Sequence, residues 1–373
     1  MQLLNGNTNG EFYRGKRKRV GPAIIVTVIA IIVIVFLVMT FYGLQKYIVV
    51  TNDGIKLDIP FLNGGASFMA QDDEGNVSVE YEKVNAELVI GEADYSNVAA
   101  SAGEGLEAIK AGFISAGNVS EATAQSYAEN LGDKNAVVLE LKPNSGKLAW
   151  KTGVEFADAY GLNGTIDLAP VISALKEKDI YVVAYMSCLV DNGLSEHYSQ
   201  MILKNAEGED CSDGSGTWLD PYSSDLKSYI IALCRELSGM GVDEIILKNV
   251  QIPYADTVVY AFNASKTAEP TPQSAVSGFA LDVTRALKSC SAKISVRCDS
   301  ETALSSGEDA STGQNAGLFF KVFDRVYCVT DSGRASELVS NAGNLIEVGS
   351  ADTRFVPMYS GESTNSGSRV ILD

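Results

Sequence analysis

From residue 109 onward the sequence predicts an α/β fold, and a closed (β/α)8 barrel of the TIM type is the leading candidate. Strand-like and helix-like segments alternate over roughly 260 residues, as they do in parallel α/β folds. The run NAVVLEL at 135–141 is apolar on both faces, which is typical of buried parallel strands. A doubly wound open sheet is the alternative, but the glycine-rich fingerprint expected after its first strand is missing.

The expected strands are short runs rich in valine, isoleucine and tyrosine, residues that favour a pleated, half-buried surface. Turn residues or helix-like stretches separate them. Eight such runs lie at 109–115, 135–141, 180–186, 244–250, 293–298, 325–329, 354–359 and 368–372.

Apolar residues at helical spacing predict amphipathic helices between these runs. Asn118 and Glu121 predict a capping box for a helix that ends at Leu131. Asp167 predicts the N-cap of the next helix. The apolar faces of this helix and of two later ones lie at 168–175, at 226–237 and at 276–287.

Residues 20–44 contain no charged residue and predict a transmembrane helix. A helix rises about 1.5 Å per residue, so roughly 20 apolar residues cross a hydrocarbon core of about 30 Å. Five basic residues lie between positions 14 and 19, whereas only Lys46 closely follows the run, which places the N-terminus in the cytoplasm. A cleaved signal peptide is the alternative, but its apolar region would span only about 7 to 15 residues and end in small residues.

The predicted organisation therefore has four parts. Residues 1–19 form a cytoplasmic basic tail, and residues 20–44 anchor the chain in the lipid bilayer. Residues 45–107 form an extracytoplasmic stalk and linker, in which β-rich segments at 48–51 and 55–59 predict a hairpin around Asn52-Asp53-Gly54. Residues 108–373 form the barrel, so we expect a single-pass protein of the cell membrane.

The formal net charge of the chain is −18. Residues 1–19 carry +4, which leaves −22 for the rest. Such an acidic ectodomain argues against a nucleic-acid partner and against docking flat on anionic lipid. It is compatible with a neutral or cationic ligand, although acidic surfaces also serve solubility alone.

The cysteine and histidine content excludes several kinds of site. None of the six cysteines stands in a CxxC pair, and several fall inside expected strands or helices, so we expect buried thiols. His197 is the only histidine, which excludes most zinc sites, and we expect it on the surface. No P-loop, GxSxG or GxGxxG occurs in a supporting context, so the sequence predicts neither a metal nor a cofactor.

Four stretches of the sequence resemble a family of bacterial TIM-barrel domains that are glycosyl-hydrolase-like. They are NAVVLELKPNSGKLAW, DIYVVAYM, WLDPYSSDL and GVDEIILKNVQIPY. Members of that family typically show NAVVIDVKDDxG, a strand ending in IAR, a W-x-DPYS segment and EIxFDYVRFP. The resemblance runs from about residue 109 to 359. It implies a barrel whose cleft lies at the carboxyl ends of the strands and a carbohydrate as the substrate class.

The sequence departs from that family where catalysis would be expected. The Asp of EIxFDYVRFP, a natural nucleophile or charge-stabilising carboxylate, is Lys248 here. The next Tyr is Asn249 and the Arg is Gln251. The acid expected near the end of the fifth strand is Arg297, with Asp299 two residues on.

In the second strand, Glu140 stands where the family's motif has an Asp, so an acidic residue is present at this position. The lysine of the same motif is also present, as Lys142. The resemblance therefore implies Glu140 and Asp299 as the candidate catalytic pair. Glycoside hydrolysis needs two carboxylates, about 5–5.5 Å apart in retaining enzymes and about 6.5–9.5 Å in inverting ones. A lysine at one of these positions opposes the positive charge of the transition state, so we expect hydrolysis to be weakened or lost. Loop acids that could substitute for the missing carboxylate are Asp191, Asp256, Asp299 and Asp331.

The candidate ligand-binding residues follow expected strands or match the family's motifs. The aromatic ones among them could stack on sugar rings or simply pack within loops. Lys248 could form a buried ion pair with Glu140, or it could serve as a Schiff-base amine. The candidates are Lys142, Tyr185, Asp191, Trp218, Asp220, Tyr222, Lys248, Asn249, Gln251 and Tyr254.

Three functions remain open at this point. The first is a membrane-anchored pseudoenzyme that binds cell-envelope polysaccharide with little or no hydrolysis. The second is an active glycosidase that uses a non-standard carboxylate pair. The third is a non-catalytic envelope scaffold whose ligand is another protein.

Overall fold

The computed structural model describes residues 48–51, 54–57, 95, 97–205, 207–253, 258–259, 271–361 and 367–372. The chain divides into two compact units, Met1–Glu87 and Leu88–Asp373. No helix in these described ranges is long and apolar enough to cross a membrane. Residues 20–44, for which we predict the membrane helix, lie outside them.

The described part of the first unit is a two-stranded hairpin. Strand β1 (Ile48–Thr51) pairs antiparallel with β2 (Gly54–Leu57), with Ile48 opposite Leu57 and Thr51 opposite Gly54. The hairpin predicted at this position is therefore confirmed.

The second unit contains a closed barrel of eight parallel strands. Each barrel strand pairs with the next one along the chain, and the last strand closes on the first with Val370 opposite Ala111. The predicted parallel α/β barrel is confirmed as a closed barrel of eight parallel strands, and closure excludes the doubly wound open sheet. The strands are β3 (Lys110–Ile114), β4 (Ala136–Lys142), β5 (Tyr181–Ser187), β9 (Glu244–Lys248), β11 (Lys293–Arg297), β12 (Val326–Thr330), β13 (Phe355–Ser360) and β14 (Arg369–Leu372).

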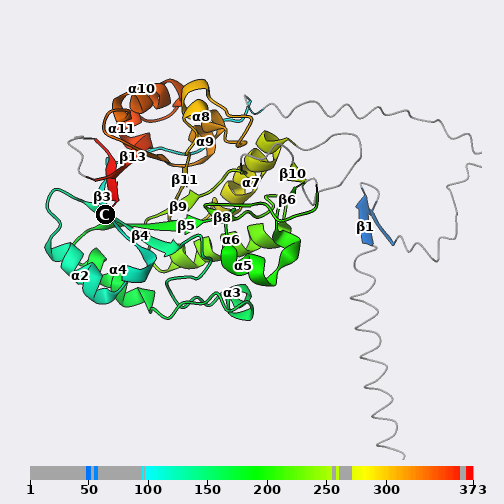
Figure 1. Cartoon of the computed structure of the whole chain (residues 1–373), viewed down its shortest axis with the longest axis horizontal. Coiled ribbons are helices and arrows are strands. Elements are labelled where there is room, and N and C mark those ends of the chain that lie inside the picture. Colours follow the sequence, from blue (N-terminus) through cyan, green and yellow to red (C-terminus); the bar gives the residue numbers. More distant parts are fainter. Residues whose placement is uncertain are drawn as a thin grey trace, which may run out of the picture. The chain divides into compact units, whose positions relative to one another are not determined.

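Helices surround the barrel, with α2 packed beside α4 and α6 beside α7 (Figure 1). The α-helices are α2 (Glu121–Glu129), α3 (Glu155–Ala159), α4 (Leu168–Lys176), α5 (Asn192–His197), α6 (Ser224–Gly239), α7 (Pro272–Leu287), α8 (Glu301–Ser306), α9 (Ala316–Val322), α10 (Ala335–Leu345) and α11 (Ala351–Arg354). The loops after β5 and β9 add two short antiparallel ladders. These are β6 (Lys204–Asn205) with β10 (Val258–Val259), and β7 (Ser212–Asp213) with β8 (Gly216–Thr217).

The capping box predicted at Asn118 and Glu121 is wrong. Residues Ala116–Asn118 form a 3-10 turn, and Ser120 is the N-cap of α2. The Ser120 hydroxyl oxygen accepts the backbone N–H of Thr123 at 3.1 Å and lies 2.8 Å from the Thr123 hydroxyl oxygen. This Ser-x-x-Thr pair satisfies a free N–H of the first turn, which is the task the capping box would have performed.

The strand pleat separates two apolar layers. Alternate residues such as Val138, Val183, Ile246 and Val356 meet inside the barrel, where they form a small cluster of their own. Their sequence neighbours point outward and form a larger core with the helices. Successive side chains of a strand point to opposite faces, so one strand supplies both layers.

A buried charge network fills the amino-terminal end of the barrel. The Glu244 carboxylate forms an ion pair with Arg325, and both side chains are almost completely buried. The hydroxyls of Ser295 and Tyr327 donate to Glu244 Oε1 at 2.6 and 2.8 Å, and that of Tyr181 donates to Oε2 at 3.1 Å. A carboxylate so deeply buried is tolerated because it is both paired and hydrogen-bonded.

Removing the cation from this network should destabilise the protein strongly. We expect Arg325→Met to lower the free energy of unfolding by about 3–5 kcal/mol, because the Glu244 charge remains buried without its partner. Urea unfolding of the full chain in detergent measures the loss. The double variant Glu244→Gln/Arg325→Met leaves no buried charge and should recover part of it; equal losses in both variants would contradict this explanation.

Candidate functional site

The carboxyl ends of four neighbouring strands bring polar side chains together at the barrel mouth. The side chains of β4 that point into the barrel are Ala136, Val138 and, at the carboxyl end of the strand, Glu140. The same alternation holds in the next three strands. The corresponding inward-facing residues near the carboxyl ends are Tyr185 in β5, Lys248 in β9 and Arg297 in β11. Since β4, β5, β9 and β11 are adjacent in the barrel, the four side chains form one continuous arc.

Glu140 and Lys248 form an ion pair at the mouth. Lys248 Nζ lies 3.0 Å from Glu140 Oε1, and the two side chains are only 10% and 17% exposed, respectively. Glu140 Oε2 also accepts the backbone N–H of Ala116 at 3.3 Å. Lys248 Nζ lies 4.9 Å from the centre of the Tyr185 ring, within the range of a cation–π contact. Burial lowers the pKa of Lys248, and the neighbouring Glu140 opposes that shift.

A second ion pair lies beside the first. Arg297 donates to Asp299 Oδ2 from Nε at 2.8 Å and from one terminal nitrogen at 2.6 Å, and its other terminal nitrogen donates to the Tyr185 hydroxyl. Burial alone would lower the pKa of Arg297, but Tyr185 and Asp299 outweigh it and keep the group charged. Burial raises the pKa of Tyr185 to about 12, so its hydroxyl is neutral near pH 7.

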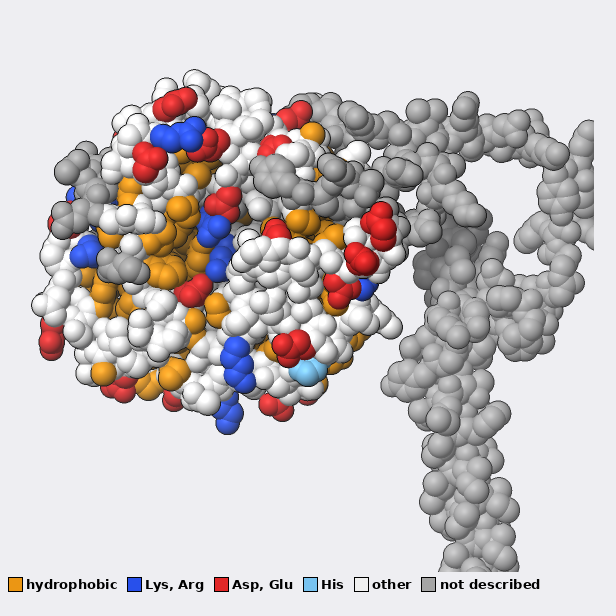
Figure 2. All heavy atoms as spheres, viewed as in Figure 1, with side chains coloured by type: hydrophobic (Ala, Val, Ile, Leu, Met, Phe, Trp, Pro, Cys, Tyr) orange, Lys and Arg blue, Asp and Glu red, His pale blue; other side chains and the backbone are white. Residues whose placement is uncertain are grey.

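The opposite arc of the mouth is mostly apolar, with one polar residue, the exposed Ser360, at the end of the inward series of β13. The inward series of β3, β12 and β14 end in Phe113, Val329 and Leu372. Val329 is 40% exposed, and Phe113 meets the Tyr185 ring edge-on with 5.6 Å between ring centres. Figure 2 shows a hollow in which basic and acidic side chains lie beside a hydrophobic surface. The mouth therefore offers charged groups on one side and apolar surface on the other.

A bulge at the end of β4 separates Glu140 from Lys142. The pairing with β5 shifts between these two residues, so they do not share a face as the simple alternation would predict. Lys142 turns away from Lys248 and forms a completely buried ion pair with Asp191, 2.5 Å between Nζ and Oδ2. Its Nζ also donates to the Ser187 carbonyl at 3.0 Å. Lys142 and Asp191, both predicted to bind ligand, are thus part of the scaffold in this structure.

Gly146 is required by the same ion pair. Its φ of 79° lies in the left-handed region, and an added Cβ would stand 1.9 Å from the Asp191 carboxylate. Asp191 Oδ1 accepts the backbone N–H of Leu194 at 2.7 Å and so caps α5. The lysine and glycine of the KPNSG stretch therefore fix the loop after β4 against the start of α5.

Asn249 occupies a strained position directly after Lys248. Its φ of 57° is uncommon for a residue with a side chain, although asparagine tolerates it better than most. Its side-chain nitrogen donates to Asn144 Oδ1 at 2.9 Å and to the Ser187 hydroxyl at 2.8 Å. These bonds join the loops after β4, β5 and β9 beneath the mouth. Gln251 is half-buried on the same β9 loop.

Three further predicted site residues, Trp218, Asp220 and Tyr222, lie on the connection from β8 to α6. Trp218 and Asp220 are buried, and Asp220 Oδ1 accepts the backbone N–H of Tyr222 at 2.8 Å. The Tyr222 hydroxyl lies 3.3 Å from the Ser274 hydroxyl, at the start of α7. Tyr254 lies outside the described residues. His197 is exposed at the end of α5, as predicted.

The cysteines behave as predicted. All six are free, and every one except the half-buried Cys290 is buried. Burial raises the pKa of the Cys188 thiol to about 12, which leaves it protonated and unreactive near pH 7.

Gln314 positions two strands of the mouth, and no sequence motif marks it. Its side-chain oxygen accepts the backbone N–H groups of Asp299 and Ser300 at 3.0 and 2.8 Å. Its nitrogen donates to the carbonyls of Val250 at 3.3 Å and Arg297 at 3.5 Å. One buried amide therefore ties the loop after β9 to that after β11.

Asp309 fixes the loop that carries Gln314. Its carboxylate accepts the hydroxyls of Ser300 at 2.6 Å, Ser311 at 2.6 Å and Thr312 at 2.9 Å. Burial alone would raise the pKa of Asp309, but these hydrogen bonds outweigh it and lower the pKa to about 2. The carboxylate is therefore ionised at any pH at which the protein would normally be handled.

A sizeable cavity lies away from the mouth residues. It encloses about 680 Å³ between the start of α7 and the connection from α8 to α9, and none of the mouth residues line it. Cavity size alone would point to this rim position, whereas paired charges and the ends of the strands point to the mouth. The mouth is therefore the candidate functional site, because convergent charged groups, rather than volume, carry chemistry.

Comparison with known proteins agrees with the sequence resemblance. Residues 115–330 match the family described as "Putative glycosyl hydrolase domain". No curated protein matches the chain.

Solved structures with similar folds include two bacterial proteins. A hypothetical protein from Ruminiclostridium thermocellum is 21% identical, with 49% of this chain and 95% of that chain covered and a TM-score of 0.44. The PgaB (BpsB) glycoside hydrolase domain from Bordetella bronchiseptica is 13% identical, with 70% and 87% covered and a TM-score of 0.48.

The buried pair beneath the mouth should be essential to stability. We expect Lys142→Met to cost about 3–5 kcal/mol in the free energy of unfolding, because Asp191 is left charged and buried. Lys142→Met/Asp191→Asn keeps the α5 cap without the charge and should be less destabilised. Thermal and urea unfolding compare the two. Lys227→Met, which breaks the surface pair with Asp282 at 2.7 Å, is the control and should cost no more than about 1 kcal/mol.

Asp309 should make stability depend on acid pH. Its folded-state pKa lies below the unfolded value of about 3.9, so its contribution is complete above that pH and is lost as pH falls through about 2. We expect Asp309→Asn to be less stable than wild type by about 1–2 kcal/mol at pH 7, with the difference shrinking toward pH 2. Urea unfolding across this range measures it. A difference independent of pH would show that the carboxylate charge is not the cause.

Proposed function

Because the chain belongs to the "Putative glycosyl hydrolase domain" family, we propose that its barrel mouth binds a neutral polysaccharide of the cell envelope without hydrolysing it. Residues 20–44 hold this domain at the outer side of the cell membrane. The observation that carries the proposal is the 3.0 Å ion pair between Glu140 and Lys248.

The ion pairs argue against hydrolysis through the family's site. A glycosidase needs one carboxyl group as a proton donor and a second carboxylate as nucleophile or base. Here the Glu140 carboxylate is paired with Lys248, and Asp299 accepts two hydrogen bonds from Arg297. The two cations neutralise the two carboxylates, so the mouth lacks the net negative charge that would stabilise the positive charge developing on the sugar in the transition state.

The same groups suit the binding of an uncharged sugar. Each ion pair joins one cation to one carboxylate, so the arc of Glu140, Lys248, Arg297 and Asp299 carries no net charge. The Lys248 ammonium has three N–H donors, of which Glu140 accepts one. Across the mouth, Phe113 and its neighbours supply an apolar surface for the less polar face of a sugar ring.

The predicted membrane anchor is the reason for proposing an envelope polysaccharide as the ligand. With the basic tail in the cytoplasm, the barrel would face the polysaccharides that lie outside the membrane. A tethered domain does not diffuse away from them, so a modest affinity for each sugar unit would suffice to hold it at the envelope.

The binding claim can be tested with purified peptidoglycan sacculi. We expect the full chain in detergent to co-sediment with them, and Lys248→Met to weaken binding about 10- to 100-fold, since a hydrogen bond to a charged group contributes about 1.5–3 kcal/mol. Lys227→Met is the matched control and should bind like wild type. No co-sedimentation of the wild-type chain with this or any other envelope polysaccharide would favour a protein-binding scaffold.

The absence of hydrolysis can be tested on the same material. Reducing ends released by the wild-type chain should stay at the level of a blank without protein. Release above the blank that disappears in Glu140→Gln would contradict the proposal and would favour an active glycosidase with a non-standard carboxylate pair.

A further inference from the structure

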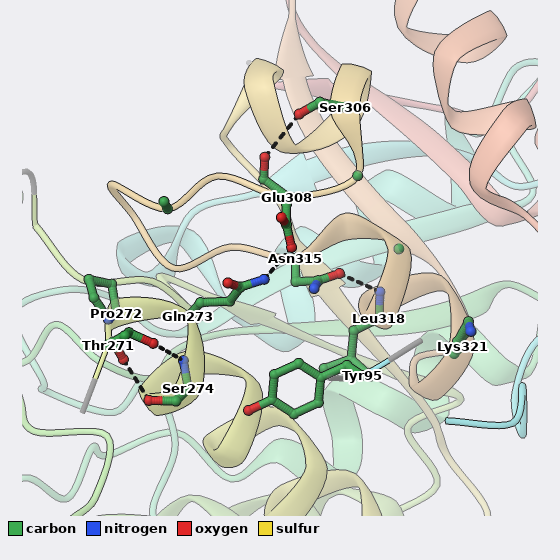
Figure 3. A pocket seen from close by; sticks show the side chains of 13 residues that line it. Tyr95, Thr271, Pro272, Gln273, Ser274, Ser306, Glu308, Asn315, Leu318 and Lys321 are labelled. Atoms are coloured by element: carbon green, nitrogen blue, oxygen red, sulfur yellow. Dashed lines mark hydrogen bonds between the residues drawn. The ribbon is translucent and has the colours of Figure 1, made fainter. Parts of the chain in front are cut away.

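The 680 Å³ cavity on the rim has the composition of a ligand site (Figure 3). Its volume falls within the range of about 300–1,000 Å³ that is usual for small-molecule sites. Three parts of the chain meet there: the residue Tyr95, the start of α7, and the connection between α8 and α9. Helices that precede barrel strands begin at the carboxyl ends of the strands, so the cavity lies on the same side of the barrel as the mouth.

Tyr95 forms an aromatic wall of this cavity. The backbone N–H of Val98 donates to the Tyr95 carbonyl at 3.1 Å, and the backbone N–H of Ser101 donates to the Lys321 carbonyl of α9 at 2.8 Å. Both Tyr95 and Val98 pack against the outer core, so the ring is held in place and is half-buried. Burial raises the pKa of Tyr95, which keeps its hydroxyl neutral.

Amide and carboxylate groups form the facing wall, with Gln273, Glu308 and Asn315 across the cavity from the ring (Figure 3). The Gln273 side-chain nitrogen donates to Glu308, which fixes both side chains and leaves the Gln273 oxygen as an acceptor. The Asn315 side-chain oxygen accepts the backbone N–H of Leu318 at 2.7 Å. The Asn315 amide N–H groups have no partner among the described residues and remain available as donors.

The charges of the cavity select against anions. Lys321 is paired with Glu347 at 3.2 Å, whereas Glu308 has only the neutral Gln273 as a described partner. A planar ring facing fixed amide and carboxylate groups suits a ligand with one apolar face and several hydroxyls. A sugar ring has this character, and an acidic sugar would be repelled by Glu308.

We propose that this cavity is a second carbohydrate subsite, in which one uncharged sugar unit stacks on Tyr95 and hydrogen-bonds to Gln273, Glu308 and Asn315. This subsite goes beyond the site proposed at the mouth and needs none of its residues. A polysaccharide chain long enough to reach from the mouth to the rim would engage both sites, which would raise its affinity over that of a short fragment.

The test isolates the rim by working in the Lys248→Met background. The full chain in detergent is titrated with N-acetylchitotetraose and with cellotetraose by isothermal titration calorimetry, and circular dichroism checks the fold of each variant. We expect at least one of the two probes to bind. Adding Tyr95→Ala or Gln273→Ala should weaken it at least fivefold, whereas Tyr95→Phe and the surface control Gln125→Ala should not. Tetragalacturonate, which is anionic, should bind more weakly than the neutral probes.

The outcomes separate this proposal from the one for the mouth. If neither neutral probe binds Lys248→Met while one binds wild type, the rim subsite is wrong and the mouth proposal stands. If binding is unchanged in Lys248→Met but is lost with Tyr95→Ala, the rim binds sugar and the mouth proposal fails. Equal affinities with and without Tyr95→Ala and Gln273→Ala in the Lys248→Met background would overturn the subsite.

Discussion

The alternation of side chains along parallel strands is the constraint on which the whole site depends. In β9 (Glu244–Lys248) the inward positions are Glu244 at the floor, Ile246 in the middle and Lys248 at the mouth. One five-residue strand therefore supplies a buried structural charge, a core residue and a site residue. Closure of the barrel then places Lys248 beside the equivalent residues of the neighbouring strands. The bulge after Glu140 is the point where this alternation is broken, and there Lys142 turns into the scaffold.

At both ends of the barrel an acidic side chain is paired with a basic one, but the pairs have different roles. At the floor, Glu244 and Arg325 are almost completely buried, and hydroxyls satisfy the remaining acceptor sites. At the mouth, Glu140 and Lys248 retain some exposure, so a ligand can compete for their hydrogen bonds. At the floor, pairing stabilises charges that are fully buried, and at the mouth it sets the charge that the proposed binding surface presents. A carboxylate neutralised by a lysine is also a poor participant in glycoside hydrolysis, which connects the electrostatics to the proposed loss of activity.

The sequence predicted the repeating features better than the singular ones. The strand-helix rhythm marks all eight barrel strands, and the resemblance to EIxFDYVRFP identifies Lys248 as the site's unusual residue. The pairing of Lys248 with Glu140 could also be predicted from the sequence, because each is the last inward-facing residue of its strand. The bulge, by contrast, depends on how β4 is matched to β5, and local sequence does not encode it. The roles of Gln314 and Tyr95 arise from contacts between distant segments. The sequence left sugar stacking and loop packing open for Trp218, and its burial in the structure agrees with loop packing.

We propose that the mouth holds an intact glycan against the ion pair of Glu140 and Lys248. A crystal structure of the full chain grown with an oligosaccharide that it binds tests this most directly. We expect an uncleaved sugar in the mouth, hydrogen-bonded to Lys248 and packed on the side of Phe113. A cleaved product beside Glu140, or a mouth left empty by a ligand bound elsewhere, would contradict it.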